Sequence, residues 1–319
     1  MKPHEYTGKD LAFLIPTKDR PQNVEALLQS LAAQTVACGR VIVVDGGESI
    51  EKLVLGFRNR LAVEYYACRP PGQIRQRNLG ISKLGAAVRL VGFLDDDLAL
   101  ESDAVDKMLA FWNSTQGDTA GVGFNIVNAP PYRASLLGRL FFLSSPSPGR
   151  VLRSGYNTRV DNIDHDLRTQ WLGGGYAVWK REILEKYPQP ELDTRWAIGE
   201  DLRFSYPIGK THPLWVCADA KARLMPVFEQ QLTAAAYRYR GYKGALHFFY
   251  FVCSHPELSR IACLWMLMAR ICAHFALACM KLDATLLHVG IGESRAVCTS
   301  LGSLLGLADL KTALEDRAH

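Results

Sequence analysis

The sequence lacks the features that mark several broad classes of protein. Its eight cysteines include no C-x-x-C pair, so a structural zinc site is not indicated. A net charge of only +5 does not require a nucleic-acid partner. The N-terminal residues are polar and charged rather than apolar, and we find no internal repeat or heptad run. We therefore expect a globular protein of the cytoplasm, with one large or two modest domains in its 319 residues.

Short apolar runs alternate with helical patterns through the first half of the chain. Such alternation predicts an α/β fold in which helices flank a mainly parallel central sheet. Buried or half-buried strands are predicted at residues 11–15, 40–44, 62–67, 88–94 and 119–127, with two shorter ones at 213–218 and 221–225. Helices are predicted at about residues 21–34, 75–85 and 102–113.

Acidic residues follow two of these strands directly. Asp45 ends the strand at 40–44, and Asp95, Asp96 and Asp97 end the strand at 88–94. The carboxyl ends of parallel strands lie at one edge of a sheet, where ligands bind. Three adjacent carboxylates are costly there without a cation or hydrogen-bond donors. Two interpretations remain open from the residues alone: a solvated acidic turn that caps a helix, and a site for a hard divalent ion.

Three further groups of residues are candidates for binding or catalysis. Arg75, Arg77 and Asn78 lie early in a predicted helix and could donate to a phosphate or base, although they could also form a solvated basic turn. The glycines at 173–175 would allow a ligand to approach the backbone closely, or could mark a bulge. Glu200 and Asp201 fit either a favourable acidic first turn of a helix or a general base.

Five short motifs occur in order: residues 15–20 (IPTKDR), 43–45 (VVD), 77–80 (RNLG), 93–97 (FLDDD) and 199–201 (GED). Together they resemble the family 2 glycosyltransferases, which have the GT-A fold, over about residues 10–227. The resemblance implies inverting transfer of a sugar from a nucleotide-diphosphate donor, with UDP- or dTDP-sugars favoured. The acceptor it implies is a hydroxyl of a glycan or a lipid-linked sugar.

The resemblance also implies a role for each matching residue. Asp201 would be the general base, with Glu200 beside it, and Asp97 with Asp95 would hold Mn²⁺ or Mg²⁺. The implied donor-binding residues are Pro16, Thr17, Arg20, Asp45, Arg75, Arg77, Asn78, Asp95, Asp96, Gly174 and Gly175.

One departure weakens the metal prediction. Many family members carry a metal-ligating histidine after the strand that follows the base, whereas residues 219–225 contain none. Water or phosphate oxygens would then complete the coordination shell, and Arg223 could contact the diphosphate. Two alternatives stay open: a sugar-1-phosphate nucleotidyltransferase, which would need a glycine-rich loop that is absent at residues 15–20, and a non-catalytic nucleotide-sugar-binding protein.

The C-terminal part, residues 228–319, is expected to be a helical extension of a glycosyltransferase domain at 1–227. Its residues 261–282 are long enough for a membrane span, but a helical wheel places Arg260, Arg270, His274 and Lys281 in one polar arc. We expect a helix that contacts a membrane surface through residues 256–282, with core packing and a homodimer as alternatives. Arg240, Lys243 and His247 also share a face, which could bind an anion or be solvated.

Overall fold

The computed structural model describes residues 5–115, 117–191, 198–226 and 232–315. The chain forms two compact units, each built from several segments. The first contains Met1–Tyr132, Val160–Leu192 and Phe204–Val227, and the second contains Arg133–Arg159, Asp193–Arg203 and Phe228–His319. The expected division at residues 227 and 228 does not follow these units, because two internal segments group with the C-terminal helices. That division stays a prediction.

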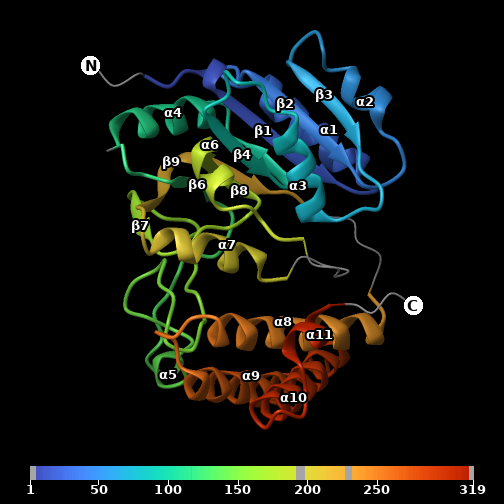
Figure 1. Ribbon diagram of the computed structural model, residues 1–319, viewed down its shortest axis with the longest axis vertical. Helices are drawn as coiled ribbons and strands as arrows, with labels where there is room; N and C mark the ends of the chain where they lie inside the picture. Colours follow the sequence, from blue (N-terminus) through green and yellow to red (C-terminus); the bar gives the residue numbers. More distant parts are fainter. Residues whose placement is uncertain (1–4, 116, 192–197, 227–231, 316–319) are drawn as a thin grey trace. The chain divides into compact units, whose positions relative to one another are not determined.

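The first unit contains a nine-stranded mixed sheet, drawn in blue to gold in Figure 1. The strand order is β3-β2-β1-β4-β8-β6-β9-β5, and β7 pairs with β9. The strands are β1 (Leu11–Thr17), β2 (Arg40–Asp45), β3 (Val63–Ala67), β4 (Leu90–Leu94), β5 (Leu98–Leu100), β6 (Gly121–Ile126), β7 (Leu167–Thr169), β8 (Tyr176–Lys180) and β9 (Leu214–Leu224). The predicted α/β architecture with a mainly parallel half is confirmed, because β1 pairs in parallel with both β2 and β4.

The register of the parallel strands places the ends of β1, β2 and β4 at the same edge of the sheet. Thr17 at the end of β1 lies opposite Asp45 at the end of β2. β4 pairs in parallel with β1, so the residues that follow Leu94 emerge at the same edge. The sequence prediction that Asp45 and the three aspartates share one side of the sheet is therefore correct.

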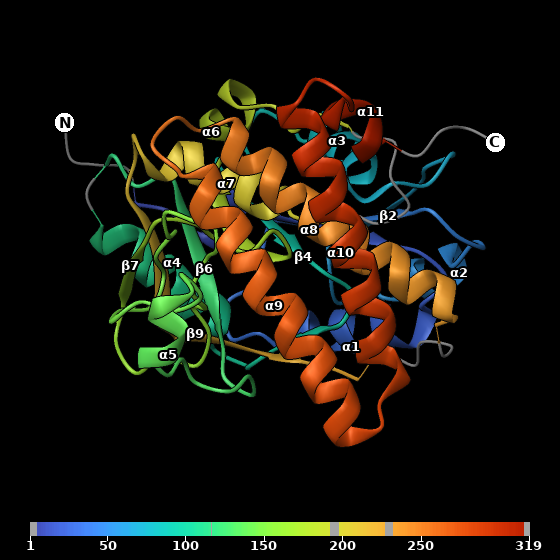
Figure 2. The same cartoon turned by 90° about the horizontal axis from the view of Figure 1, so that it is seen from below.

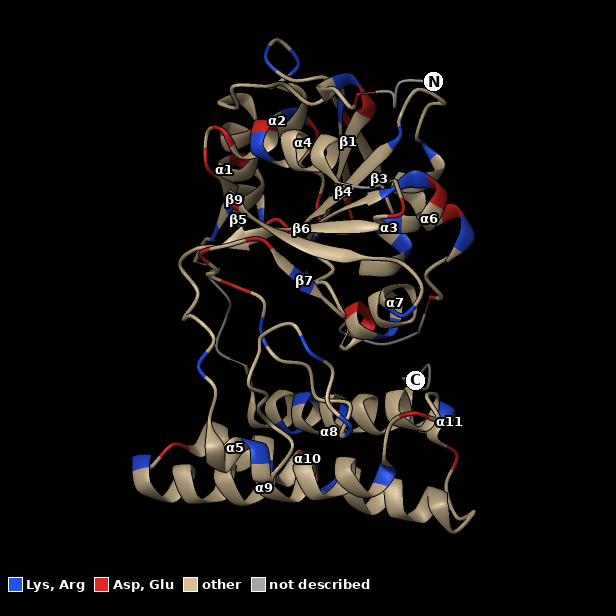
Figure 3. Ribbon diagram, turned by 90° about the vertical axis from the view of Figure 1, so that its left-hand side faces the viewer, with Lys and Arg blue, Asp and Glu red and all other residues tan. Residues whose placement is uncertain are grey.

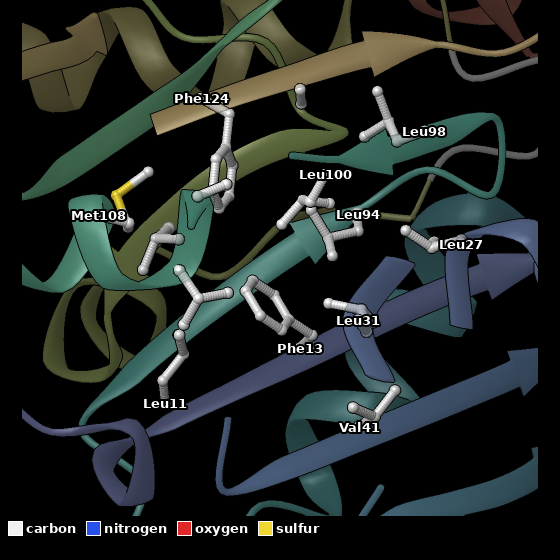
Figure 4. Packing of buried hydrophobic residues seen from close by; sticks show 14 of the residues in the cluster. Leu11, Phe13, Leu27, Leu31, Val41, Leu94, Leu98, Leu100, Met108 and Phe124 are labelled. Atoms are coloured by element: carbon white, nitrogen blue, oxygen red, sulfur yellow. The ribbon is translucent and has the colours of Figure 1, made fainter. Parts of the chain in front are cut away.

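Helices cover the sheet of the first unit. They are α1 (Pro21–Ala32), α2 (Glu51–Leu55), α3 (Gln73–Ser82), α4 (Ala104–Ser114) and α6 (Arg181–Lys186), with a 3₁₀ turn at Gly8–Asp10. Pro21 occupies the start of α1, where its missing N–H has no helical partner to lose. Val24, Leu27, Leu28 and Leu31 form the buried face of α1 that their spacing predicts. Figure 4 shows Leu27 and Leu31 of α1 near Phe13 and Val41 of the sheet.

The strand prediction for residues 213–225 is wrong in one respect. The structure has one strand of 11 residues, β9, in place of two short ones. Its pairing with β6 shifts register between Phe124 and Asn125. The side-chain amide of Asn125 donates to the carbonyl of Ala218, 3.0 Å away, and so satisfies the backbone at the irregularity. β9 can therefore continue through a position that its sequence marks as a break.

The second unit is helical. Its helices are α5 (Leu136–Leu140), α8 (Ala234–Cys253), α9 (Arg260–Lys281), α10 (Ala284–Leu304) and α11 (Leu310–Leu314), while α7 (Glu200–Gly209) begins in this unit and ends in the first. Figure 2 shows α9 and α10 side by side, and α10 also packs on α8. Helix α8 continues through Gly241 without a break. Gly241 lies against the backbone of Val289, and Gly292 against that of Arg238, so the lack of a Cβ lets α8 and α10 approach closely.

The polar arc predicted on α9 contains two residues that pair within the second unit. Arg270 donates to Glu293 at 2.7 Å, and Nδ1 of His274 lies 2.8 Å from the other oxygen of the same carboxylate. The Glu293 side chain is only 1% exposed. A buried carboxylate is costly unless it is paired, so this three-residue network holds α9 against α10.

We predict that Glu293→Ala destabilises the second unit by about 3 kcal/mol, because it leaves Arg270 and His274 at the helix contact without their common partner. The urea midpoint should fall in unfolding followed by far-UV circular dichroism. Glu293→Gln retains the shape and one acceptor oxygen and should cost less. Equal, small effects for both substitutions would contradict a structural role for the network.

Candidate functional site

The three aspartates after β4 are divided between two environments. Asp95 and Asp97 are partly exposed, whereas Asp96 between them is 4% exposed. The three residues lie between β4 and β5, with Asp96 and Asp97 in a turn, so their exposure rather than strand alternation shows which way each faces. Two carboxylates are thus presented outward, and one is turned into the protein.

Asp96 is held by the loop after β1. The hydroxyl of Thr17 donates to Asp96 at 2.6 Å, and Arg20 forms an ion pair with the other oxygen at 3.1 Å. Burial raises the pKa of Asp96, while the bonds from Thr17 and Arg20 act to lower it. Two residues predicted to bind the donor, Thr17 and Arg20, are therefore also the partners of the central aspartate.

Asp95 is positioned by α3 and by a glycine. Gln73 and Arg77 donate to Oδ1 of Asp95 at 3.0 and 3.2 Å. The Arg77 side chain is 1% exposed and its guanidinium lies 5.3 Å from the ring centroid of Phe93, so a solvated basic turn is excluded for this residue. A Cβ on Gly175 would collide with the Asp95 carboxylate, and the carbonyl of Gly175 accepts from the Asp95 N–H at 2.8 Å. Glycine at this position is therefore what allows Asp95 its place.

Asp97 has a clearly raised pKa. Burial, together with the negative charges of Asp95 and Asp96, raises the pKa of Asp97 to about 6. Unbalanced negative charge on oxygen ligands is the chemistry that suits a hard divalent cation. The described residues contain no group of three or more His, Cys, Asp or Glu side chains that could hold a metal. The donor set thus fits a cation that takes its remaining ligands from water or phosphate.

Asp45 is fully buried at the end of β2. Tyr65 donates to its Oδ2 at 2.8 Å, the N–H of Gly47 donates to Oδ1 at 2.7 Å, and Arg69 donates to its backbone carbonyl at 2.7 Å. Gln76 bridges the neighbouring strand ends by donating to the carbonyls of Thr17 and Val44, each at 2.7 Å. The ends of β1 and β2 are therefore joined by a connected set of hydrogen bonds.

Arg75 and Asn78 contact a segment far along the chain. Arg75 pairs with Glu191 at 2.9 Å, and Asn78 donates to the carbonyl of Gln189 at 3.2 Å. Pro16 is buried within β1, and Gly174 is buried before β8. Arg223 pairs with Glu101 at 3.1 Å on the exposed surface. The roles that the resemblance implies for these residues stay predictions.

Glu200 and Asp201 lie in the first turn of α7, where a helix favours acidic residues. They follow Gly199, whose φ of +71° suits glycine. A Cβ on Gly199 would lie 3.5 Å from Cβ of His247 on α8. His247 is 3% exposed, and burial beside Arg203 and Lys243 lowers its pKa to about 3. Lys243 is also buried, at 4%, so the solvated-face interpretation is wrong for Lys243 and His247, whereas Arg240 on the same helix is exposed.

An α/β sheet with acidic residues just beyond the ends of its parallel strands is typical of proteins that bind a ligand at that edge. The family model for glycosyl transferase family 2 matches residues 12–187, which is more than half of the chain. The chain therefore belongs to glycosyl transferase family 2, and it is a glycosyltransferase.

Solved structures with the same fold are only distantly similar in sequence. TarS of S. aureus (residues 1–349) is 15% identical with a TM-score of 0.57, over 94% of this chain and 83% of that one. A mannosyltransferase from Pyrobaculum calidifontis, solved with GDP-Man and Mn²⁺, is 15% identical with a TM-score of 0.52, over 96% and 85%. GalNAc-T7, solved with UDP, GalNAc and Mn²⁺, is 16% identical with a TM-score of 0.56, over 77% and 51%. No curated protein matches the sequence.

Several residues that shape the site were not predicted from the sequence. Gln73 and Gln76 face the strand ends from α3 beside the predicted Arg77, and their i, i+3, i+4 spacing with Arg77 was a usable indication. Tyr65 alternates with its neighbours in β3, but nothing in the sequence pairs it with Asp45. His247 comes from a helix more than 40 residues after Gly199, so only the fold brings the two together.

We predict that Thr17→Val destabilises the protein by about 1–3 kcal/mol near neutral pH, because the buried Asp96 carboxylate loses a donor. Burial holds the pKa of Asp96 above its usual value, and losing the Thr17 bond raises that pKa further. The penalty is therefore full where Asp96 is ionised and shrinks as the pH falls and the carboxyl becomes protonated. Urea unfolding at neutral and at acidic pH measures the full penalty and the reduced penalty, respectively.

Thr115→Val is the matched control, since the Thr115 hydroxyl donates to the carbonyl of Trp112 rather than to a carboxylate. Its effect on the urea midpoint should not vary with pH. A Thr17→Val penalty that is equally independent of pH would argue against an ionised Asp96.

Proposed function

We propose that the protein is an inverting glycosyltransferase that moves a sugar from a nucleotide-diphosphate donor, with UDP- or dTDP-sugars favoured, to a hydroxyl of a glycan or lipid-linked acceptor. The observation that carries the proposal is the outward pair Asp95 and Asp97, whose negative charge is suited to a divalent ion that could in turn bind a diphosphate. The family supports sugar transfer. Two neighbouring folds were solved with Mn²⁺ and a nucleotide or nucleotide sugar, which supports the donor class.

The metal in this proposal is Mn²⁺ or Mg²⁺ held by Asp97 and Asp95. When bound, it supplies positive charge that stabilises a departing diphosphate. Arg77 and Gln73 fix the direction of Asp95 from α3, and Gly175 leaves room for it. The protein thus provides an oriented pair of oxygens, and the donor phosphates and water provide the other ligands.

Asp201 is the proposed general base, with Glu200 beside it in the first turn of α7. The acceptor oxygen attacks the anomeric carbon, its proton passes to the Asp201 carboxylate, and the bond from the anomeric carbon to the phosphate oxygen breaks. The nucleoside diphosphate leaves with the bonding electrons. One displacement inverts the anomeric configuration and needs no covalent intermediate. Burial lowers the pKa of His247 to about 3, so its imidazole is a weak proton acceptor and would not compete as the base.

The two alternatives make different products. A sugar-1-phosphate nucleotidyltransferase would release pyrophosphate, and a non-catalytic binding protein would release nothing. Detection of a free nucleoside diphosphate together with a glycosylated acceptor would separate the proposed activity from both. The proposed location is the cytoplasm, on the inner face of the cell membrane.

We predict that Mn²⁺ increases the thermal shift produced by the correct donor in a screen of UDP-, dTDP- and GDP-sugars, because ligands of the native state raise its apparent stability. Asp97→Asn should weaken metal affinity roughly 100-fold or more, since even a supporting partner of a ligand contributes 10–100-fold. Asp219→Asn, which alters an exposed carboxylate of β9, is the control and should behave as the native protein. A donor shift that is insensitive to EDTA would refute the metal site.

We predict that Asp201→Asn lowers kcat by about 10²–10⁴ while the donor-induced thermal shift is unchanged, because the amide cannot accept the acceptor proton. Steady-state release of the nucleoside diphosphate measures kcat. Asp219→Asn again serves as the control. Full transfer by Asp201→Asn would exclude this residue as the base and leave Glu200 as the candidate.

A further inference from the structure

Helix α9 is apolar on its exposed side as well as on its buried side. Its inner face carries Arg270 and His274, which pair with the buried Glu293 of α10. Its exposed face between residues 261 and 280 consists of Ile261, Trp265, Met268, Cys272, Ala273, Ala276, Leu277, Cys279 and Met280, with charge only at Arg260 and Lys281 beyond each end. In water such a helix would leave a broad apolar surface exposed, which is unusual for a surface helix.

The exposed apolar face continues onto the neighbouring helices. The Trp265 ring stacks on Phe141 at 5.5 Å, and Trp265 Nε1 donates to the carbonyl of Leu140, so α5 lies against α9. Fifteen of the large apolar side chains that are exposed among the described residues belong to α5, α9 and α10 or directly follow them, and one, Leu224, lies elsewhere. In Figure 3 these helices are largely tan. We call the exposed residues of α5, α9 and α10 the apolar helix face.

The opposite side of this helix layer is covered. α10 packs against α8, where Gly241 and Gly292 allow close backbone contact. α9 is long and apolar enough to cross a membrane by length and composition, and a third of its most apolar window is buried inside the protein. A layer that is covered on one side and apolar on the other is suited to lie flat at a boundary rather than to cross it.

The charge beside the apolar helix face is mainly positive. Residues 133–159 contain five arginines (133, 139, 150, 153 and 159) and no Asp or Glu, and all five are exposed. The carbonyl of Arg153 accepts from the N–H of Ser259 at 2.7 Å, which ties this segment to the start of α9. Within α5, α9 and α10 the one acidic residue is the buried Glu293.

We propose that the apolar helix face docks on an anionic lipid surface, with α9 and α10 lying in the interface and the arginines of 133–159 contacting lipid headgroups. A membrane offers both the apolar layer and the negative charge that this face lacks. A second copy of the chain would bring the same five arginines together with only a few carboxylates at the helix ends, such as Glu257 and Asp283, so charge favours an anionic lipid surface over self-association. The proposal goes beyond sugar transfer and does not depend on the donor chemistry.

Vesicle flotation of the full chain tests this docking. The native protein should float with vesicles that contain phosphatidylglycerol and bind vesicles of phosphatidylcholine alone less tightly. Met268→Glu with Met280→Glu should weaken partition at least about tenfold, because two apolar side chains at the interface become charged. Leu224→Glu changes the exposed leucine outside the face and should leave partition unchanged. Far-UV circular dichroism and urea midpoints verify folding of each variant without reference to donor or activity.

The arginines are tested separately. Arg139→Glu with Arg153→Glu should remove the preference for phosphatidylglycerol while weak binding to neutral vesicles persists, as expected for headgroup contacts. Failure of the folded native protein to float with either vesicle would overturn the proposal. So would sedimentation equilibrium of the native protein as a dimer that Met268→Glu with Met280→Glu converts to monomer, since a second copy would then cover the face. Loss of sugar transfer alone would bear on the donor site and not on this inference.

Discussion

The three adjacent carboxylates after β4 repel one another. The arrangement of side chains at this edge of the sheet in the first unit depends on how that repulsion is relieved. The fold relieves this repulsion by placing the three carboxylates in different surroundings. Thr17 and Arg20 take up Asp96 inside the protein, and Gln73 and Arg77 orient Asp95. Asp97 is left with a pKa raised to about 6 by burial and by both neighbours. Because this edge leaves negative charge uncompensated, a cation bound there would raise the stability of the folded state.

The helix α3 links this charge distribution to the sheet. Arg77 is buried and donates to Asp95, while Gln76 joins the ends of β1 and β2. A shift of α3 would therefore disturb both the position of Asp95 and the hydrogen bonds between these strand ends. The arginine and the asparagine of the family motif therefore have different partners in this structure. Arg77 positions a carboxylate, and Asn78 contacts the chain at Gln189. Residues that a motif groups together need not have the same partners.

Much of the first unit was predictable, because its information is local. Apolar runs that end in aspartate specify strands whose ends meet at one edge, and the register of Thr17 with Asp45 agrees. The contacts that shape the site were less accessible. The collision of a Cβ at Gly175 with Asp95, and the bond from Tyr65 to Asp45, join segments whose spacing carries no periodic pattern. The single strand β9 was missed because Asn125 satisfies an irregularity from a different strand.

The polarity of α9 illustrates the same limit. A helical wheel finds the polar arc of Arg270 and His274 correctly but cannot say which way the arc faces, because that depends on Glu293 in the next helix. Once the carboxylate is known to be buried, the direction is determined: the charges turn inward to it and the apolar residues turn outward. The principle that divides Asp95, Asp96 and Asp97 in the first unit, that buried charge requires a partner, thus also decides which surface the second unit presents to its surroundings.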